Sequence, residues 1–420
     1  MLPLDPYQDH TMLEGLAEQY GTPFYLYDAH VIQKQIYALQ SNLHPAIQLC
    51  YSLKANPNPT IVQLMLQQGL HAEICSEHEL AAAISAGAQP HQMMVLGPGK
   101  SRQELQRLLS IGVKYVIAES LQELQIIAEL ARERACPAQV GIRVNPKSVV
   151  QGARLKMGGT ARQFGIDEEQ LPQVISWMEE CDVLSLSGIH GYFGTRILSE
   201  ETLAANFSYM LNLAEQFMDT YSLPLQYVGL GGGFGIPYYE NEKPLHLPRL
   251  GQLTKEAFQA FHKRHPHIEL LVESGRFLSG PAGIYVARVR YVKESQGVHF
   301  AILDGGTHQH AAAGGSGSLL KRNFPIEAII QEEREKKAYT LTGPLCTPDD
   351  VIGRQVMLPE LHPGDLIAVY QSGAYGLTFS PVLFLSQSLP RELLREQEQI
   401  HLIRDRHEFL VPKARRTNLS

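Results

Sequence analysis

Residues 47–97 read IQLCYSLKANPNPTIVQLMLQQGLHAEICSEHELAAAISAGAQPHQMMVLG. Short apolar runs alternate in this stretch with segments whose apolar residues lie three and four positions apart. The runs lie at 47–53, 71–75 and 93–97, and the segments between them at 60–69 and 77–87. Apolar runs of this length predict buried strands, and the three- and four-residue spacing predicts amphipathic helices. The stretch therefore predicts parallel strands joined by helices.

The same alternation continues to residue 276. Five further runs complete the set, KYVIA (114–118), QVGIRV (139–144), LSGIHGYF (186–193), LQYVGLG (225–231) and ELLVES (269–274), and LAANFSYMLNLAEQF (203–217) is a helical segment between two of them. Eight strand–helix units predict an α/β fold, a (β/α)₈ TIM barrel. The alternative is an open doubly wound sheet, in which we would expect a topological reversal or a dinucleotide fingerprint.

Three predicted helices begin with a serine that is followed three residues later by a glutamate. The pairs are Ser76 with Glu79, Ser101 with Glu104 and Ser120 with Glu123. Each pair predicts a capping box, in which hydroxyl and carboxylate accept hydrogen bonds from free backbone N–H groups of the first helical turn. These pairs place three helix starts just after the second, third and fourth strands.

After residue 280 the pattern changes to short alternating strands and turns. The predicted strands are GIYVARVRYVKES (283–295), HFAILDGG (299–306), KAYTLTGPL (337–345), DLIAVYQSG (365–373) and FLVPK (409–413), and PFYLYDA (23–29) is a strand that can pair with them. We therefore predict a barrel over 28–280 and a separate antiparallel β domain formed by 1–27 and 281–420.

Composition excludes several classes of protein. The 420 residues carry 36 Lys and Arg against 43 Asp and Glu, a net charge of −7, and 44% are hydrophobic, which is ordinary globular composition. The acidic balance argues against nucleic acid or an anionic membrane as the main partner. We find neither a secretion signal nor an apolar run of about 18 residues, so we expect a cytoplasmic protein. Five scattered cysteines without CxxC spacing indicate neither a disulfide framework nor a zinc site.

In a TIM barrel the active site lies at the carboxyl ends of the strands. Lys54 follows the first strand, and it is either a snorkelling lysine or one that forms a Schiff base with a carbonyl. The run GLGGGFG (229–235) follows the seventh strand, and it is either a tight turn or a phosphate cradle. His190 is either a core histidine or a ring stacked on a flat ligand, and Glu273 is either structural or functional. Arg143 and Asn145 close the fifth strand.

Taken together, these residues fit one ligand. An aldehyde would bond to Lys54, a phosphate would lie on the glycines, a ring face would meet His190, and a pyridine nitrogen would meet Glu273. Pyridoxal 5′-phosphate has all four features. A GGGFG run does not have the GxGxxG spacing of a dinucleotide site.

Five motifs in order, YSLKAN, GGGFG, ESGR, GPLCTPDD and SGAYG, resemble those of the fold-type III pyridoxal-phosphate decarboxylases, whose barrel is alanine racemase-like. The resemblance runs from about residue 20 to 390. It implies a carboxy-lyase of amino-acid metabolism and a head-to-tail homodimer with shared active sites. A non-catalytic cofactor-binding homologue is a remote alternative.

The resemblance also implies roles for individual residues. Lys54 would carry the cofactor, His190 would stack on its ring, and Glu273 would keep its pyridine nitrogen protonated, which favours decarboxylation over racemisation. Cys346 would act as proton donor from the other subunit, with a buried inert thiol as the alternative. The phosphate would be held by a group of backbone and hydroxyl donors: Gly232, Gly233, Gly275, Arg276 and Tyr375.

The residues around Cys346 bear on which substrate the resemblance implies. Decarboxylases of diamino acids place an acid directly after this cysteine, where the chain has Thr347, while Asp350 keeps the second acidic position. CTPDD, KMGGTARQFGID (156–167) and GGTHQHAAA look most like the subgroup acting on an L-glutamyl thioester carried by an acyl-carrier protein, as in butirosin biosynthesis. A free diamino acid (diaminopimelate, ornithine or lysine) is the alternative, with Asp349 or Asp350 reaching its distal amine. Thr347, Asp350 and Arg276 are the predicted substrate contacts.

Two predicted surface features also bear on the substrate. The run at 304–325 contains Gly314, Gly315 and Gly317, and it is either a gate or a surface loop. An acidic carrier would need a local basic patch on this acidic chain, for which Lys321 and Arg322 are the predicted residues.

Overall fold

The computed structural model describes residues 10–147, 155–156, 162–315 and 322–406. The chain divides into two compact units. One comprises Val31–Pro237 and Asn241–Ser279, and the other comprises Met1–His30, Tyr238–Glu240 and Gly280–Ser420. They are called here the barrel unit and the β unit, and each is described by itself.

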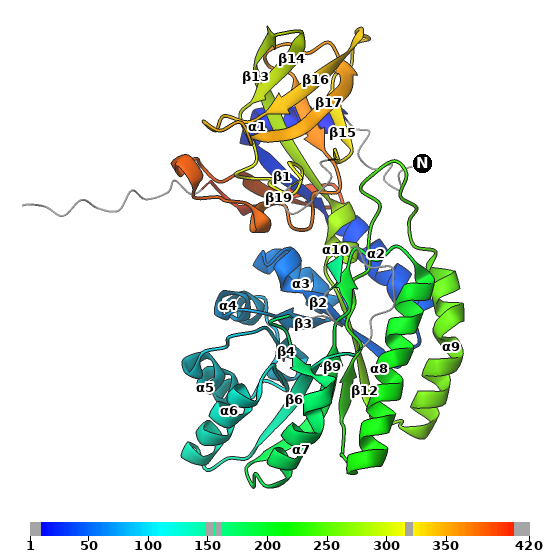
Figure 1. The fold of residues 1–420 in the computed structure, drawn as a ribbon. Helices are drawn as coiled ribbons and strands as arrows, with labels where there is room; N and C mark the ends of the chain where they lie inside the picture. Colours follow the sequence, from blue (N-terminus) through cyan, green and yellow to red (C-terminus); the bar gives the residue numbers. More distant parts are fainter. Residues whose placement is uncertain (1–9, 148–154, 157–161, 316–321, 407–420) are drawn as a thin grey trace, which may run out of the picture. The chain divides into compact units, whose positions relative to one another are not determined.

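The barrel unit contains eight parallel strands that close into a ring, so the predicted (β/α)₈ barrel is confirmed (Figure 1). In order around the ring they are β2 (Ile47–Ser52), β3 (His71–Ile74), β4 (Met93–Val95), β5 (Tyr115–Ala118), β6 (Ala138–Asn145), β9 (Leu184–Gly191), β11 (Tyr227–Gly229) and β12 (Glu269–Ser274). Pairing of β12 with β2 closes the ring. Short strands β7 (Leu155–Lys156), β8 (Ile166–Asp167) and β10 (Gly194–Thr195) flank it.

Each barrel strand is followed by a helix. These helices are α3 (Pro59–Gln67), α4 (Glu77–Ser85), α5 (Arg102–Ile111), α6 (Leu121–Glu133), α7 (Leu171–Glu179), α8 (Glu200–Tyr221), α9 (Leu247–Arg264) and the single turn α10 (Arg276–Ser279), and α2 (Ala29–Asn42) precedes β2. Figure 1 shows α3 to α9 on the outside of the strands. Within the described part of the chain, no helix is long and apolar enough to cross a membrane.

The three predicted capping serines all accept a hydrogen bond from the N–H three residues on. Only Glu104 completes the reciprocal box, by accepting from the N–H of Ser101 at 2.7 Å. Glu79 accepts from Cys75 at 2.7 Å, and Glu123 accepts from Glu119 at 3.1 Å. The box prediction is therefore wrong for two helices, because there the carboxylate satisfies the N–H one residue before the cap.

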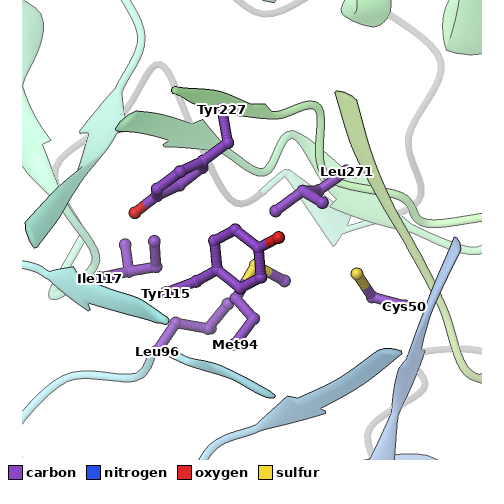
Figure 2. Packing of buried hydrophobic residues seen from close by; sticks show 7 residues of the cluster. All are labelled: Cys50, Met94, Leu96, Tyr115, Ile117, Tyr227 and Leu271. Carbon is purple, nitrogen blue, oxygen red and sulfur yellow. The ribbon is translucent and has the colours of Figure 1, made fainter. Parts of the chain in front are cut away.

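A cluster of buried, mostly large side chains packs within the barrel unit. Figure 2 shows this cluster, which consists of Cys50, Met94, Leu96, Tyr115, Ile117, Tyr227 and Leu271. The rings of Tyr115 and Tyr227 meet edge to face with centroids 4.9 Å apart. Gly141 and Gly188 make room for Tyr227, since a Cβ on either would lie within 2.3 Å of its ring or hydroxyl. Because the interior is packed here, a ligand can enter only beyond this layer.

The β unit is built on a mixed sheet. Its central order is β17 (Val351–Pro359), β16 (Lys336–Thr342), β14 (Val298–Leu303), β13 (Gly283–Ser295), β1 (Phe24–Asp28), β19 (Arg391–Glu396) and β20 (Gln399–Arg404). Strand β18 (Leu366–Val369) pairs with β13 and with β15 (Ile326–Ile329), and α1 (His10–Tyr20) precedes β1.

Two pairs in this sheet are parallel, so the prediction of an antiparallel domain is wrong in part. Strand β1 pairs antiparallel with β13, as its sequence suggested, but runs parallel to β19. Strand β14 runs parallel to β16, because the chain forms β15 elsewhere in the sheet before it returns beside β14. The predicted strand at 409–413 lies outside the described residues.

Candidate active site

Lys54 lies directly beyond the carboxyl end of β2, in the short 3₁₀ turn Leu53–Ala55. The following prolines delay the next helix, which begins at Pro59 with Asn58 as its cap. The Lys54 ammonium lies 2.9 Å from Oε1 of Glu73, and 34% of its side chain is exposed whereas that of Glu73 is fully buried. The sequence therefore places an accessible amine beside a buried carboxylate at one end of the barrel.

Glu73 is a residue that the sequence analysis missed. Its Oε1 also accepts a hydrogen bond from the Cys75 thiol at 3.0 Å, and its Oε2 has no hydrogen-bond partner among the described residues. Burial, and then the charge of Glu73, raise the pKa of Cys75 well above its usual range. Glu73 lies on β3, and the two-residue alternation of a strand places its side chain on the same face as that of His71.

His190 and Glu273 form a second buried pair. His190 Nε2 lies 2.5 Å from Glu273 Oε1, and both side chains are almost fully buried. Burial raises the pKa of Glu273, but the charge and hydrogen bond of His190 outweigh it, and Lys54 and Arg143 act in the same direction, so the pKa lies below its usual value. Glu273 is therefore held as a carboxylate, oriented by the imidazole.

The glycine run after β11 is a backbone cradle. A Cβ on Gly232 would lie 1.9 Å from the carbonyl oxygen of Glu273, and Gly231 and Gly233 have positive φ angles of 69° and 90°. None of the three N–H groups donates a hydrogen bond to a residue that the structure describes. Side chains are excluded and backbone donors remain, which is the arrangement that suits a phosphate.

Gly275 follows β12 and starts the turn into α10. A Cβ there would lie 2.8 Å from the Cβ of Ala55, so the β12 end packs closely against the turn that carries Lys54. Arg276, the first residue of α10, is half-buried. The predicted barrel residues thus lie on β2, β9, β11, β12 and the turns that follow these strands.

A buried charge network supports the same end of the barrel. Arg143 at the end of β6 donates to Glu119 Oε1 at 2.9 Å, and the N–H groups of Gly97 and Gly165 also donate to Glu119. Glu123 pairs with Lys100 at 2.7 Å. The strand ends in the sequence include Arg143, but they give no signal for Glu119, because its apolar run ends one residue earlier.

The remaining predicted residues lie in the β unit. Cys346 is exposed and Thr347 is half-buried in the loop between β16 and β17. Asp350 is 2% exposed, and it accepts hydrogen bonds from the N–H groups of Thr307 and Leu345. Asp350 therefore shapes the loop of Cys346, and its substrate contact stays a prediction. Tyr375 is half-buried and has a φ of +55°.

The barrel residues fit pyridoxal phosphate by their chemistry. The cradle supplies unpaired N–H donors, Lys54 supplies an accessible amine, and Glu273 supplies a carboxylate for a ring nitrogen. The buried Ser274 hydroxyl beside Glu273 has no hydrogen-bond partner within the described chain.

Comparisons with known proteins agree with this assignment. Residues 29–280 match the family model described as "Pyridoxal-dependent decarboxylase, pyridoxal binding domain". The chain is 40% identical to L-glutamyl-[BtrI acyl-carrier protein] decarboxylase of Niallia circulans, over 94% of each chain. It is 28% identical to diaminopimelate decarboxylase of Aquifex aeolicus, over 94% of this chain and 92% of the relative.

Solved structures are similar over nearly the whole chain. The diaminopimelate decarboxylase of Helicobacter pylori complexed with L-lysine superposes with a TM-score of 0.85 at 27% identity, over 94% of this chain and 96% of the other. The matched pyridoxal-binding domain covers the barrel strands that carry the site, so the cofactor is pyridoxal phosphate. The chain belongs to the family of pyridoxal-dependent amino-acid decarboxylases.

Proposed function

We propose that the chain removes the α-carboxylate of an L-glutamyl group carried as a thioester on an acyl-carrier protein. The observation that carries this choice is the 40% identity, over 94% of both chains, to a relative named for that reaction. The neutral Thr347 beside Cys346 supports it, because a distal ammonium would be expected to need an acid there. Asp350, buried and occupied by backbone donors, is poorly placed to serve a free diamino acid.

Four groups of the barrel unit bind and orient the cofactor in this proposal. The N–H groups of 231–233 bind the phosphate, and Lys54 provides the amine of attachment. Glu73 orients the Lys54 nitrogen and is positioned to hold its proton. Glu273, itself oriented by His190, accepts a hydrogen bond from the ring nitrogen. When bound there, pyridoxal phosphate would supply an electron sink for the pair left on the α-carbon as carbon dioxide departs.

The last proton would come from Cys346 of a second copy of the chain. Support for a homodimer comes from exposed apolar side chains in the β unit. Of the ten large hydrophobic residues exposed in the described chain, four lie within one short segment: Phe379, Leu383, Phe384 and Leu385. Such a cluster is typical of a protein interface.

The other predicted contacts remain proposals. The proposed phosphate contacts are Gly232, Gly233, Gly275, Arg276 and Tyr375, and the proposed substrate contacts are Thr347 and Arg276.

Recognition of an acidic carrier would use local basic residues. Arg322 is exposed, and its guanidinium lies over the Tyr239 ring at 5.4 Å. Lys321, the second residue predicted for this patch, lies outside the described residues, as does Gly317 of the predicted gate or surface loop.

The test is release of carbon dioxide from two kinds of substrate. We expect rapid release from carrier protein loaded with L-glutamate as a thioester, and slow release from free glutamate, lysine, ornithine and diaminopimelate. The variant Thr347→Glu should strengthen the binding of a free diamino acid roughly ten- to a hundredfold, because a charge-assisted hydrogen bond contributes about 1.5 to 3 kcal/mol. Thr347→Gln is the matched neutral control. Faster turnover of a free diamino acid than of the thioester by the unmodified chain would reject the proposal.

A further inference from the structure

Tyr192 presents an aromatic ring to Lys54. It follows β9 directly and lies two residues beyond His190, so strand alternation directs both side chains to the inner face of the barrel. The Lys54 nitrogen lies over the Tyr192 ring, 5.7 Å from its centroid. A flat group attached to that nitrogen would therefore lie close to this ring.

The side chain of His190 pairs with Glu273. Its side chain is fully buried, and its Nε2 is used by Glu273 at 2.5 Å. The ring fills the space that Gly229 leaves, since a Cβ there would lie 2.6 Å from Cδ2 of His190. His190 thus belongs to the layer of the barrel that orients Glu273, one step deeper along β9 than Tyr192.

Arg143, which lies over the ring, and Thr195 hold the Tyr192 side chain in place. The guanidinium of Arg143 lies 6.0 Å from its centroid and 4.9 Å from that of Phe164, and Arg143 is itself fixed by Glu119 at 2.9 Å. The hydroxyl makes a hydrogen bond with Thr195, and burial raises the pKa of Tyr192, although Lys54 opposes this. The side chain is therefore a neutral, oriented ring beside the amine.

We propose that Tyr192, and not His190, is the ring against which the pyridine ring of the bound cofactor stacks. The proposal rests on the attachment of the cofactor to Lys54. A cofactor with its aldehyde carbon at Lys54, its phosphate on 231–233 and its nitrogen toward Glu273 is bounded on three sides, and Tyr192 supplies the missing face. Offset aromatic stacking of this kind stabilises a bound ring and fixes its tilt.

The test compares three variants of the holoenzyme without any substrate. Tyr192→Leu removes the ring, Tyr192→Phe keeps it, and Phe193→Leu removes the adjacent ring, which packs edge to face on Tyr209 instead. We expect Tyr192→Leu to weaken retention of pyridoxal phosphate roughly three- to tenfold and to change the visible circular dichroism of the bound cofactor. Tyr192→Phe should restore both properties, and Phe193→Leu should leave both close to those of the unmodified protein.

Unchanged retention and an unchanged visible spectrum in a folded Tyr192→Leu protein would overturn the proposal. So would an equal loss in Tyr192→Phe, since that variant keeps the ring. If Tyr192→Leu does not fold, Tyr192→Met at the same position provides the ringless comparison. Because the readouts need no substrate, failure of the glutamyl thioester as a substrate would leave this result intact. Persistence of the visible band in Lys54→Ala would instead refute the attachment on which the inference rests.

Discussion

At the scale of single residues, the site consists of two buried carboxylates with different partners. Glu73 faces the Lys54 amine, and Glu273 faces the His190 imidazole. A buried acid without a partner would be costly, so each acid is stabilised by the group that it faces. In the proposed function, Glu73 would serve the carbon attached to Lys54 and Glu273 would serve the ring nitrogen of the cofactor.

Substituting Glu273 tests the second of these roles. Glu273→Gln should lower turnover by a factor on the order of 10² to 10⁴, as is typical for a positioned acid or base, because a neutral amide no longer stabilises a protonated ring nitrogen. Cofactor content should remain close to normal, since Lys54 and the glycine cradle are unchanged. Steady-state turnover and cofactor absorbance measured on the same sample check this, and near-normal turnover would make Glu273 a purely structural acid.

The sequence predicted one carboxylate of the two. Glu273 is the first residue of the ESGR motif and follows a clear apolar run, whereas Glu73 lies inside a five-residue run and looks like an interruption of it. Two-residue alternation along the strands could have found both Glu73 and Tyr192, because inward positions on β3 and β9 continue to the barrel end. The direction of the His190 ring could not be predicted, since it depends on Glu273, a residue 83 positions away.

At the scale of secondary-structure elements, buried and exposed ion pairs lie side by side around α5. Lys100 and Glu123 are each 7% exposed, whereas Arg107 and Glu77 are each more than 40% exposed. Burial raises the pKa of Glu123, and Lys100 opposes that rise. The buried pair joins the start of α5 to the start of α6.

Removing the Lys100 amine should lower the free energy of unfolding far more than removing the Arg107 guanidinium. Lys100→Met leaves Glu123 buried without its partner, which typically costs about 3 to 5 kcal/mol. Arg107→Met breaks an exposed pair that is worth about 0 to 1 kcal/mol. Urea unfolding of the two variants measures this difference, and equal free energies of unfolding would show that Glu123 is satisfied without Lys100.

His310 gives the β unit a pH-dependent stability. Burial lowers the pKa of His310 to about 3, and its ring lies against Tyr25, Tyr285 and Phe324. Between an unfolded pKa of about 6.5 and the folded value, the unfolded chain binds one proton more, so stability falls as pH falls by about 1.4 kcal/mol per unit. His310→Gln cannot take up this proton.

We therefore expect His310→Gln to lose less stability than the unmodified chain between pH 7.5 and pH 5.5. The variant starts lower at pH 7.5, because it loses ring packing and reshapes the hydrogen bond to Ser372. Urea midpoints at both pH values give the comparison. An identical pH-dependent loss in the two proteins would mean that His310 does not contribute to the slope.

The sequence was most informative about the secondary-structure elements of the barrel. All eight barrel strands were predicted, since long apolar runs separated by amphipathic helices give a strong periodic signal. Prediction failed for β15, β17, β19 and β20. Strand β15 has four residues, four of the six residues of β19 are charged, and Gly353, Arg354 and Gln355 interrupt the apolar pattern of β17. The parallel pairings of β1 and β14 depend on partners far along the chain, so no local pattern could specify them.

At the scale of the whole molecule, the proposed function depends on a dimer with shared active sites. The proposed proton donor Cys346 belongs to the β unit, and Lys54 and Glu273 belong to the barrel unit. Mixing inactive Lys54→Ala with inactive Cys346→Ala protein, after dissociation and reassociation, should restore part of the activity through hybrid dimers with one intact site. A mixture of Lys54→Ala with Glu273→Gln, both altered in the barrel unit, is the matched control and should recover none.

No recovery in the first mixture, under conditions where subunits exchange, would contradict the shared site. It would place Cys346 in the site of its own chain or outside catalysis. Exchange itself is checked by mass on differently tagged copies.

The central claim, that Lys54 at the end of β2 carries the cofactor, is tested most directly by reducing the holoenzyme with borohydride and mapping the modified peptide by mass spectrometry. The account predicts a phosphopyridoxyl group on the peptide that contains Lys54, and its loss in Lys54→Ala. Modification of another lysine, such as Lys100 or Lys114, in place of Lys54 would contradict the account.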